Sequence, residues 1–120
     1  MSLSCFQVFL GLKRDLVGEL GITDSEVFVD PGYDPEAGYQ RALAGDVEDG
    51  GIGIALYDAI YRGYSPPGKN TINILSLQGY DPWERFEADY FAGRRDAYYA
   101  EKKRMADLLI AQAERALLAK

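Results

Sequence analysis

Histidine is absent from the 120 residues of this chain, and Cys5 is the only cysteine. Without imidazole, the chain cannot form a Ser-His-Asp triad, a Cys-His dyad or a zinc site built on histidine. A single thiol excludes an internal disulfide, which fits a reducing compartment and predicts a cytoplasmic protein. The missing residue types argue against an independent enzyme, because neither an activated nucleophile pair nor metal-ligand spacing is present.

Positive charge and long apolar runs are also scarce. The chain has 13 basic and 19 acidic residues, a net charge of −6. An acidic surface repels phosphate backbones, so we expect no nucleic-acid partner. No apolar run approaches the roughly 20 residues that span a bilayer, and the first residues lack the features of a signal peptide.

The composition is that of a folded protein, with 48% hydrophobic and 27% charged residues. A chain of this length buries enough surface for one core, so residues 1–120 are predicted to form a single domain. We find no internal repeat, linker or low-complexity segment.

Apolar residues alternate with a period of two in several segments, which is typical of β-strands. Strands are expected at residues 6–12, 27–29, 52–61 and 72–77. In the first of these, Phe9 lies out of phase with its apolar neighbours, so we expect the second face of that strand to be partly covered. In the last, the adjacent Ile74 and Leu75 predict a bulge or burial on both faces.

The residues between the two long central strands read as a turn. Pro67 and Gly68 fit the two middle positions of a type II turn, where proline presets φ and glycine accepts a positive φ. Lys69 could bind an anion, but a lone lysine in a turn is weak support for a site. We therefore expect an antiparallel hairpin closed by a structural turn.

Helices are expected at residues 35–43, 81–91 and from 94 to the end of the chain. Asp34 followed by Pro35 is a typical helix start, and Gly45 a typical stop. Asp81, Pro82 and Glu84 match a capping box. Gly93 is the expected joint before the last helix. Together these elements predict an α+β fold: a small antiparallel or mixed sheet of 3–4 strands packed with about three helices.

The sequence contains no complete motif for a dinucleotide cofactor or a metal ion. Gly51 and Gly53 begin a G-x-G pattern, but Leu56 occupies the third glycine position and the segment leads into a strand rather than a helix. The acidic residues around Asp46 lie between glycines, which favours a solvated loop over a cation site. We therefore predict no catalytic, cofactor-binding or metal-binding residue.

The chain contains 9 tyrosines. Tyr57 and Tyr61 share a face by the strand period, and Tyr64 follows shortly after. Two interpretations stay open. They form either an amphipathic sheet face whose hydroxyls reach water, or an aromatic floor for an elongated apolar substrate.

Four segments occur in an order that resembles a known family: FQVFLGLKRDL, VFVDPGYDPE, LYDAIYRGYSPPGKNTINILSLQGYDPWERFE and KKRMADLLIAQAE. Together they are similar to the middle of FAD-dependent oxidoreductases of the phytoene desaturase and all-trans-retinol saturase group. The similarity covers nearly the whole chain. Its most distinctive piece is a strand, a Pro-Pro-Gly turn, a second strand and Gly-Tyr-Asp-x-Trp at the start of a helix.

The resemblance implies a substrate-binding domain excised from a larger flavoprotein. In that family, a separate dinucleotide fold binds FAD and the middle segment walls a pocket for a long apolar molecule. FAD is thus implied for the parent protein but not for this chain, which would be inactive alone. Tyr57 and Tyr61 are the candidates for the border of that pocket.

The same resemblance implies the partners. They are the FAD-binding domain of the same polypeptide and an apolar small molecule, with peripheral membrane contact of the parent. An isolated domain is expected to form a homodimer through the face that the flavin domain would cover. The alternative is a free-standing α+β module that binds a ligand or a protein. We also expect the opening Met-Ser-Leu to be a remnant of an expression tag.

Overall fold

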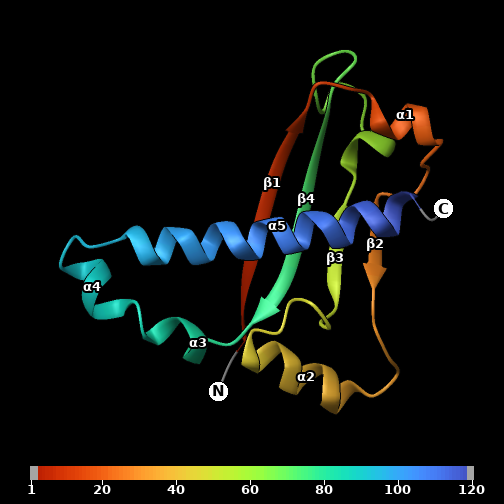
Figure 1. Ribbon diagram of the computed structural model, residues 1–120. Coiled ribbons are helices and arrows are strands. Elements are labelled where there is room, and N and C mark those ends of the chain that lie inside the picture. Colours follow the sequence, from red (N-terminus) through yellow and green to blue (C-terminus); the bar gives the residue numbers. More distant parts are fainter. Residues whose placement is uncertain (1–2, 119–120) are drawn as a thin grey trace.

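The computed structural model describes residues 3–118 and shows an α+β fold built on one four-stranded sheet (Figure 1). The strands follow the spatial order β1-β4-β3-β2, and every neighbouring pair is antiparallel. Their bounds are β1 Ser4–Leu12, β2 Glu26–Val29, β3 Ile52–Ala55 and β4 Asn70–Gln78. The predicted fold class is therefore confirmed, and the mixed-sheet alternative is wrong.

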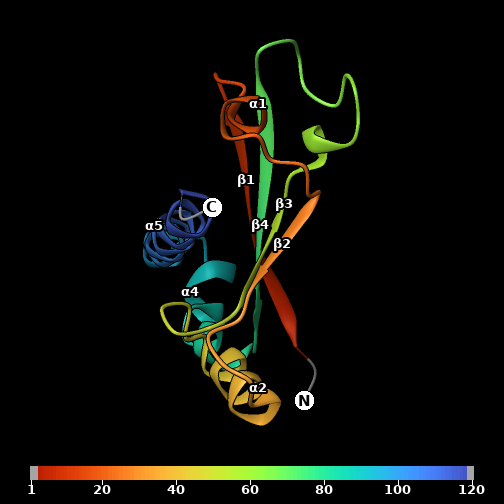
Figure 2. The same cartoon turned by 90° about the vertical axis from the view of Figure 1, so that its right-hand side faces the viewer.

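The helices lie on one face of this sheet and at its two ends (Figure 1). Their bounds are α1 Leu16–Leu20, α2 Pro35–Ala44, α3 Asp81–Glu84, α4 Glu87–Phe91 and α5 Asp96–Leu118, with a 3₁₀ helix, η1, at Tyr57–Ala59. The long α5 runs across the strands on one face (Figure 1). Figure 2 shows the sheet edge-on, with α5 on one side and no α-helix lying across the other.

The core forms between α5 and the face of the sheet that it covers. From the sheet, Val8, Ile54 and Ile74 are buried, with Ile74 fully enclosed. From α5, Met105 and Leu109 are buried at helical spacing. The buried residues of the strands recur every second position and those of α5 every fourth, so one face of the sheet packs against one face of the helix and is buried.

The longest pairing, β1 with β4, is regular. Its register runs without interruption from Ser4 opposite Gln78 to Leu12 opposite Asn70. Of the two alternatives for Ile74 and Leu75, the bulge is therefore wrong. Ile74 is buried against the core, and Leu75 faces the other side of the sheet, where it is half-buried. The expected cover over Phe9 is wrong as well, since 69% of that residue is exposed.

The predicted strand 52–61 is too long. It ends at Ala55, after which buried Leu56 turns the chain into η1. The antiparallel pairing of β3 with β4 is confirmed, but residues 56–69 connect them instead of a tight hairpin turn. The turn itself is confirmed: the Lys69 amide donates to the Pro66 carbonyl over 3.1 Å, and Gly68 has a φ of 73°.

The helix starts divide into one confirmed and one wrong prediction. The Asp34 carboxylate accepts hydrogen bonds from the amides of Glu36 and Ala37, so it caps α2 as expected. Asp81 is instead the first residue of α3, whose cap position holds Tyr80 without a capping side chain. The expected helix 81–91 is broken at residues 85–86 into α3 and α4.

The glycine predicted as a joint is confirmed, since Gly93 has a φ of 86° between α4 and α5. Among residues 3–118, none of the helices combines the length and the apolar character needed to cross a bilayer. Met1 and Ser2, which belong to the expected tag remnant, lie outside the described residues.

Candidate functional site

The face of the sheet opposite α5, here called the open face, carries an apolar surface that no α-helix of residues 3–118 crosses. Phe28 is 78% exposed, Phe9 69% and Leu77 50%. By register, the open face consists of Cys5, Gln7, Phe9, Gly11, Glu26, Phe28, Gly53, Ala55, Thr71, Asn73, Leu75 and Leu77. Exposed aromatic and aliphatic side chains gathered on one face are typical of a binding surface.

A shallow hollow of about 130 Å³ lies in the middle of the open face. Its floor includes Gly53, and a Cβ built on Gly53 would stand 3.5 Å from the Phe28 ring, at ordinary contact distance. Asn73 and Leu75 form one side, and Tyr57 closes the end toward η1. Small residues beneath larger ones give the sheet room for a flat, apolar ligand.

The predicted substrate-facing tyrosines lie at the upper end of this face, but not on a strand. Tyr57 begins η1, and its ring centre is 6.3 Å from that of Tyr61 and 5.6 Å from that of Tyr64. The connection that carries them projects to the side of the sheet away from α5 (Figure 2). Tyr57 and Tyr61 do lie side by side, as predicted, but they do so in and after a 3₁₀ helix and not on one face of a strand. Only Tyr57 lines the central hollow, and Tyr61 is 58% exposed beside it.

Asp58 holds this tyrosine cluster in place. Its carboxylate accepts hydrogen bonds from the Ser65 amide at 3.0 Å, the Ser65 hydroxyl at 2.8 Å and the Thr71 amide at 2.9 Å. These bonds hold the connection against the start of β4, where Thr71 lies. The position of Tyr57 at the rim of the open face thus depends on a neighbouring carboxylate that sequence periodicity did not single out.

One polar atom on the open face has no hydrogen-bond partner among the described residues. The Asn73 Oδ1 is buried, and the amide nitrogen of the same side chain is 3.5 Å from the Gln7 Oε1. A buried, unpaired amide oxygen costs free energy. The middle of the open face therefore combines apolar walls with one unsatisfied acceptor.

Sequence analysis identified Phe9 and Leu75 as out of phase with the core but did not single out the open face, which also includes Phe28 and Leu77, as a site. Each was visible as an apolar residue where the strand period calls for a polar one. The adjacent Ile74 and Leu75, which predict either a bulge or burial on both faces, lie in a regular strand that carries apolar residues on both faces.

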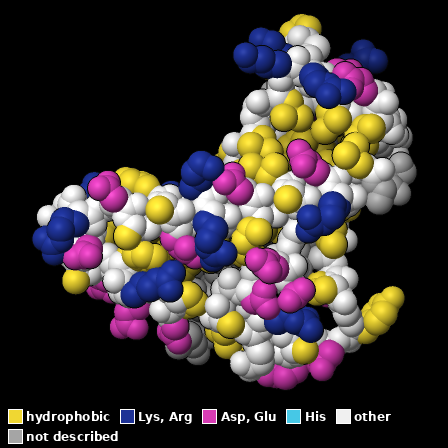
Figure 3. All heavy atoms as spheres, viewed as in Figure 1, with side chains coloured by type: hydrophobic (Ala, Val, Ile, Leu, Met, Phe, Trp, Pro, Cys, Tyr) yellow, Lys and Arg dark blue, Asp and Glu magenta, His cyan; other side chains and the backbone are white. Residues whose placement is uncertain are grey.

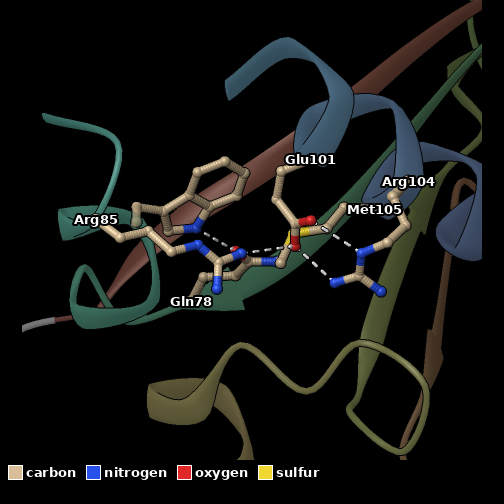
Figure 4. Close-up of polar contacts among 6 residues, drawn as sticks. Gln78, Arg85, Glu101, Arg104 and Met105 are labelled. Atoms are coloured by element: carbon tan, nitrogen blue, oxygen red, sulfur yellow. Dashed lines mark hydrogen bonds and ion pairs between the residues drawn. The ribbon is translucent and has the colours of Figure 1, made fainter. Parts of the chain in front are cut away.

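A second notable cluster joins the helices to the lower end of the sheet on the α5 side (Figure 4). The Trp83 indole donates to Gln78 Oε1 at 2.8 Å, and the Gln78 amide contacts the Met105 sulfur at 3.2 Å. Glu101 makes a two-pronged ion pair with Arg104 and a longer contact of 3.7 Å to Arg85. The hydrogen bonds from Arg104 lower the pKa of Glu101, against the opposing effect of burial. Each group here has its partner, so the cluster is a structural junction.

The glycine run at residues 50–53 does not have the form of a dinucleotide-binding loop. The glycine run at 50–53 leads directly into β3, and a Cβ on Gly51 would stand 3.3 Å from the Val29 carbonyl oxygen, which leaves no cradle for a phosphate. Within residues 3–118, no three acidic or thiol side chains converge as metal ligands would. In the acidic loop, Asp46 instead accepts a hydrogen bond from the Asp49 amide.

Comparisons with known protein families, with curated proteins and with solved structures found no match to this chain.

Proposed function

We propose that this chain is the substrate-binding domain of an FAD-dependent oxidoreductase of the desaturase or saturase type, acting on a polyene or another elongated apolar molecule. The observation that carries the proposal is the open face, where exposed Phe9, Phe28 and Leu77 lie across three strands. A sheet covered on one side only, with apolar side chains on the other, supports a second domain closing over it.

In this proposal the chain binds and orients; it does not carry out chemistry. The apolar side chains would exclude water from the substrate, and the hollow beside Gly53 would admit a flat chain. Tyr57 and Tyr61 would border one end of the bound molecule. FAD would be held by another domain of the same polypeptide.

The order of the four resembling segments supports the same proposal, because the tyrosines and the Pro-Pro-Gly turn fall within the third of them. The flavin domain and the apolar substrate are the proposed partners, and peripheral membrane contact of the parent follows from a lipophilic substrate. A protein of this kind in a reducing compartment would be cytoplasmic.

The absorption spectrum of the whole reading frame that encodes this chain tests the proposal. A flavin spectrum that the 120-residue chain does not show would support it. A colourless product would overturn it and favour the free-standing binding module.

Variants of the open face test the residues. Phe28→Lys should weaken binding of a conjugated polyene to the full-length protein, because it places a charge beside the hollow. Leu20→Lys is the matched control, since Leu20 is a partly exposed apolar residue on the opposite side of the sheet. Equal effects of both variants would contradict the assignment of the open face.

A further inference from the structure

The two edges of the sheet are protected very differently. The β2 edge is four residues long, begins with Glu26 and is flanked by Asp24, Asp30 and Pro31, the charges and proline that usually prevent strand pairing. The β1 edge is nine residues long, and Ser4–Leu12 contains neither a charge nor a proline. In the described chain, β1 pairs with β4 alone, so its outer backbone groups are free to pair.

The helix above β1 is longer than the sheet beneath it. At about 1.5 Å per residue, the 23 residues of α5 extend about 34 Å, whereas four strands spaced about 4.8 Å apart measure about 15 Å from first to last. The buried residues of α5 begin at Met105. The first part of α5 extends beyond β1 (Figure 1); residues 96–104, which precede Met105, are here called the overhang.

The overhang lies beside one half of β1. Tyr98 and Lys102 line a hollow together with Ser4, Phe6 and Gln7. Phe6 also stacks on Trp83, with ring centres 5.9 Å apart. The first half of β1 is thus the half that α5 crosses.

The second half of β1 borders an uncovered apolar groove of about 520 Å³ on the same side of the sheet. Leu10 and Leu12 of β1 form its floor, α1 contributes Leu16, and α5 contributes Leu117. Hydrophobic side chains gather visibly between α5 and α1 in Figure 3. One half of β1 therefore has a helix beside it, and the other half has a groove.

We propose that a second copy of this chain pairs its β1 with this β1, antiparallel, about a two-fold axis at Val8. That axis is the midpoint of Ser4–Leu12, so it pairs all nine residues, with Phe6 opposite the partner's Leu10 and Ser4 opposite the partner's Leu12. Each overhang then lies over the groove of the other copy. The same two-fold axis therefore pairs the unpaired edge of β1 and covers the apolar groove.

The charges and spacings permit this arrangement. Lys13 and Arg14 follow Leu12, so in this register they lie beyond the end of the opposing strand and face no like charge. The helix crosses β1 near Phe6, about two residues or 7 Å from the axis, which sets the two copies of α5 about 14 Å apart. That separation exceeds the roughly 8–10 Å of packed helices, so they do not collide.

Sedimentation of the purified chain over a wide range of concentrations tests the proposal. We expect a dimer whose dissociation constant rises about tenfold or more in the double variant Gln7→Lys/Phe9→Lys, because these exposed residues oppose each other across the axis and would place lysines face to face. Phe28→Lys is the matched control, since it removes an equally exposed phenylalanine from the same face but not from β1. A monomeric wild type, a double variant that still dimerises, or a dimer lost in Phe28→Lys would each overturn the proposal, the last because the open faces would then be the contact.

A disulfide tests the register independently. The axis at Val8 places Cys5 opposite the partner's Gly11, and opposed residues in antiparallel strands have Cα atoms about 4.5–5.5 Å apart, within disulfide range. Gly11→Cys should therefore give a covalent dimer on mild oxidation, and a Cβ at Gly11 meets nothing within 4 Å. Cys5→Ser/Gly11→Cys is the control and should not cross-link. A dimer in solution that Gly11→Cys fails to link would contradict this pairing.

Discussion

The Trp83 indole nitrogen donates a hydrogen bond to Gln78 Oε1 over 2.8 Å and so joins α3 to the last residue of β4. Gln78 is 3% exposed, and its amide nitrogen contacts the Met105 sulfur of α5. A single buried side chain therefore connects the sheet to two helices. Met105, which Gln78 contacts, directly follows the overhang in α5.

Removing the indole donor should destabilise the fold. Trp83→Phe keeps a ring against Phe6 but leaves the buried Gln78 Oε1 without its donor. We expect the free energy of unfolding to fall by about 1–3 kcal/mol, measured by urea denaturation followed by circular dichroism. Tyr99→Phe, at a half-exposed aromatic residue on α5, is the control and should change it little. Equal stability of Trp83→Phe and wild type would show that water replaces the indole.

A methyl group at Gly79 should be poorly tolerated. A Cβ there would lie 2.7 Å from the Leu43 carbonyl oxygen and 3.0 Å from the Leu43 Cα, both backbone atoms of α2. We expect Gly79→Ala to lower the free energy of unfolding by about 1–3 kcal/mol, measured as a lower thermal midpoint. Gly11→Ala meets nothing within 4 Å and is the matched control. Similar midpoints for the two variants would mean that α2 moves away without cost.

The tyrosine cluster should loosen when Asp58 is truncated. Asp58→Ala removes the acceptor of three hydrogen bonds from Ser65 and Thr71. We expect faster amide hydrogen exchange at Ser65 and Thr71, together with a loss of stability of about 1–3 kcal/mol. Asp58→Asn retains one acceptor oxygen and should lie between the variant and the wild type. Unchanged exchange in Asp58→Ala would show that the ring contacts alone hold the connection.

Ionisation of Glu101 should make the free energy of unfolding depend on pH in the acidic range. Its pKa is lowered from the ordinary value of 4.5, first by the hydrogen bonds from Arg104. Because the folded-state pKa lies below the unfolded one, the ion pair stabilises the fold above the unfolded-state pKa. This contribution is lost as the pH falls through the folded-state pKa.

Glu101→Gln should therefore be less stable than wild type by about 1 kcal/mol near neutral pH, with the difference vanishing in strong acid. Urea denaturation at both pH values measures this. Asp107→Asn breaks an exposed pair with Lys103 and is the control, with an expected effect near zero. A difference for Glu101→Gln that persists in acid would assign it to packing instead of charge.

Local signals in the sequence were sufficient for several elements. Asp34 and Pro35 define the start of α2, and Gly93 marks the joint before α5, because a cap or a positive φ depends on only a few neighbouring residues. The type II turn at Pro67 and Gly68 was predictable for the same reason. The alternation in 6–12 and 72–77 likewise located β1 and β4, whose apolar residues follow the period of two.

The rest depended on contacts between distant residues. The length of β3 was decided where Leu56 enters the core and its amide donates to the Ser25 carbonyl, an interaction that periodicity does not encode. Asp81 matches a capping box, yet α3 starts at Asp81 itself and no side chain caps it. Trp83, two residues on, instead bonds Gln78 at the end of β4.

The candidate site divides along the same line. The alternation of residue types already shows that the strands carry apolar residues in both phases, among them Phe9, Phe28 and Leu75. Which phase is buried depends on the packing of α5, because α5 covers one face of the sheet and leaves the other open. Tyr57 lies at the open face because hydrogen bonds to Asp58 hold its connection there, and not because it belongs to a strand. Such hydrogen bonds join residues that are distant in the sequence, so residue spacing does not predict them.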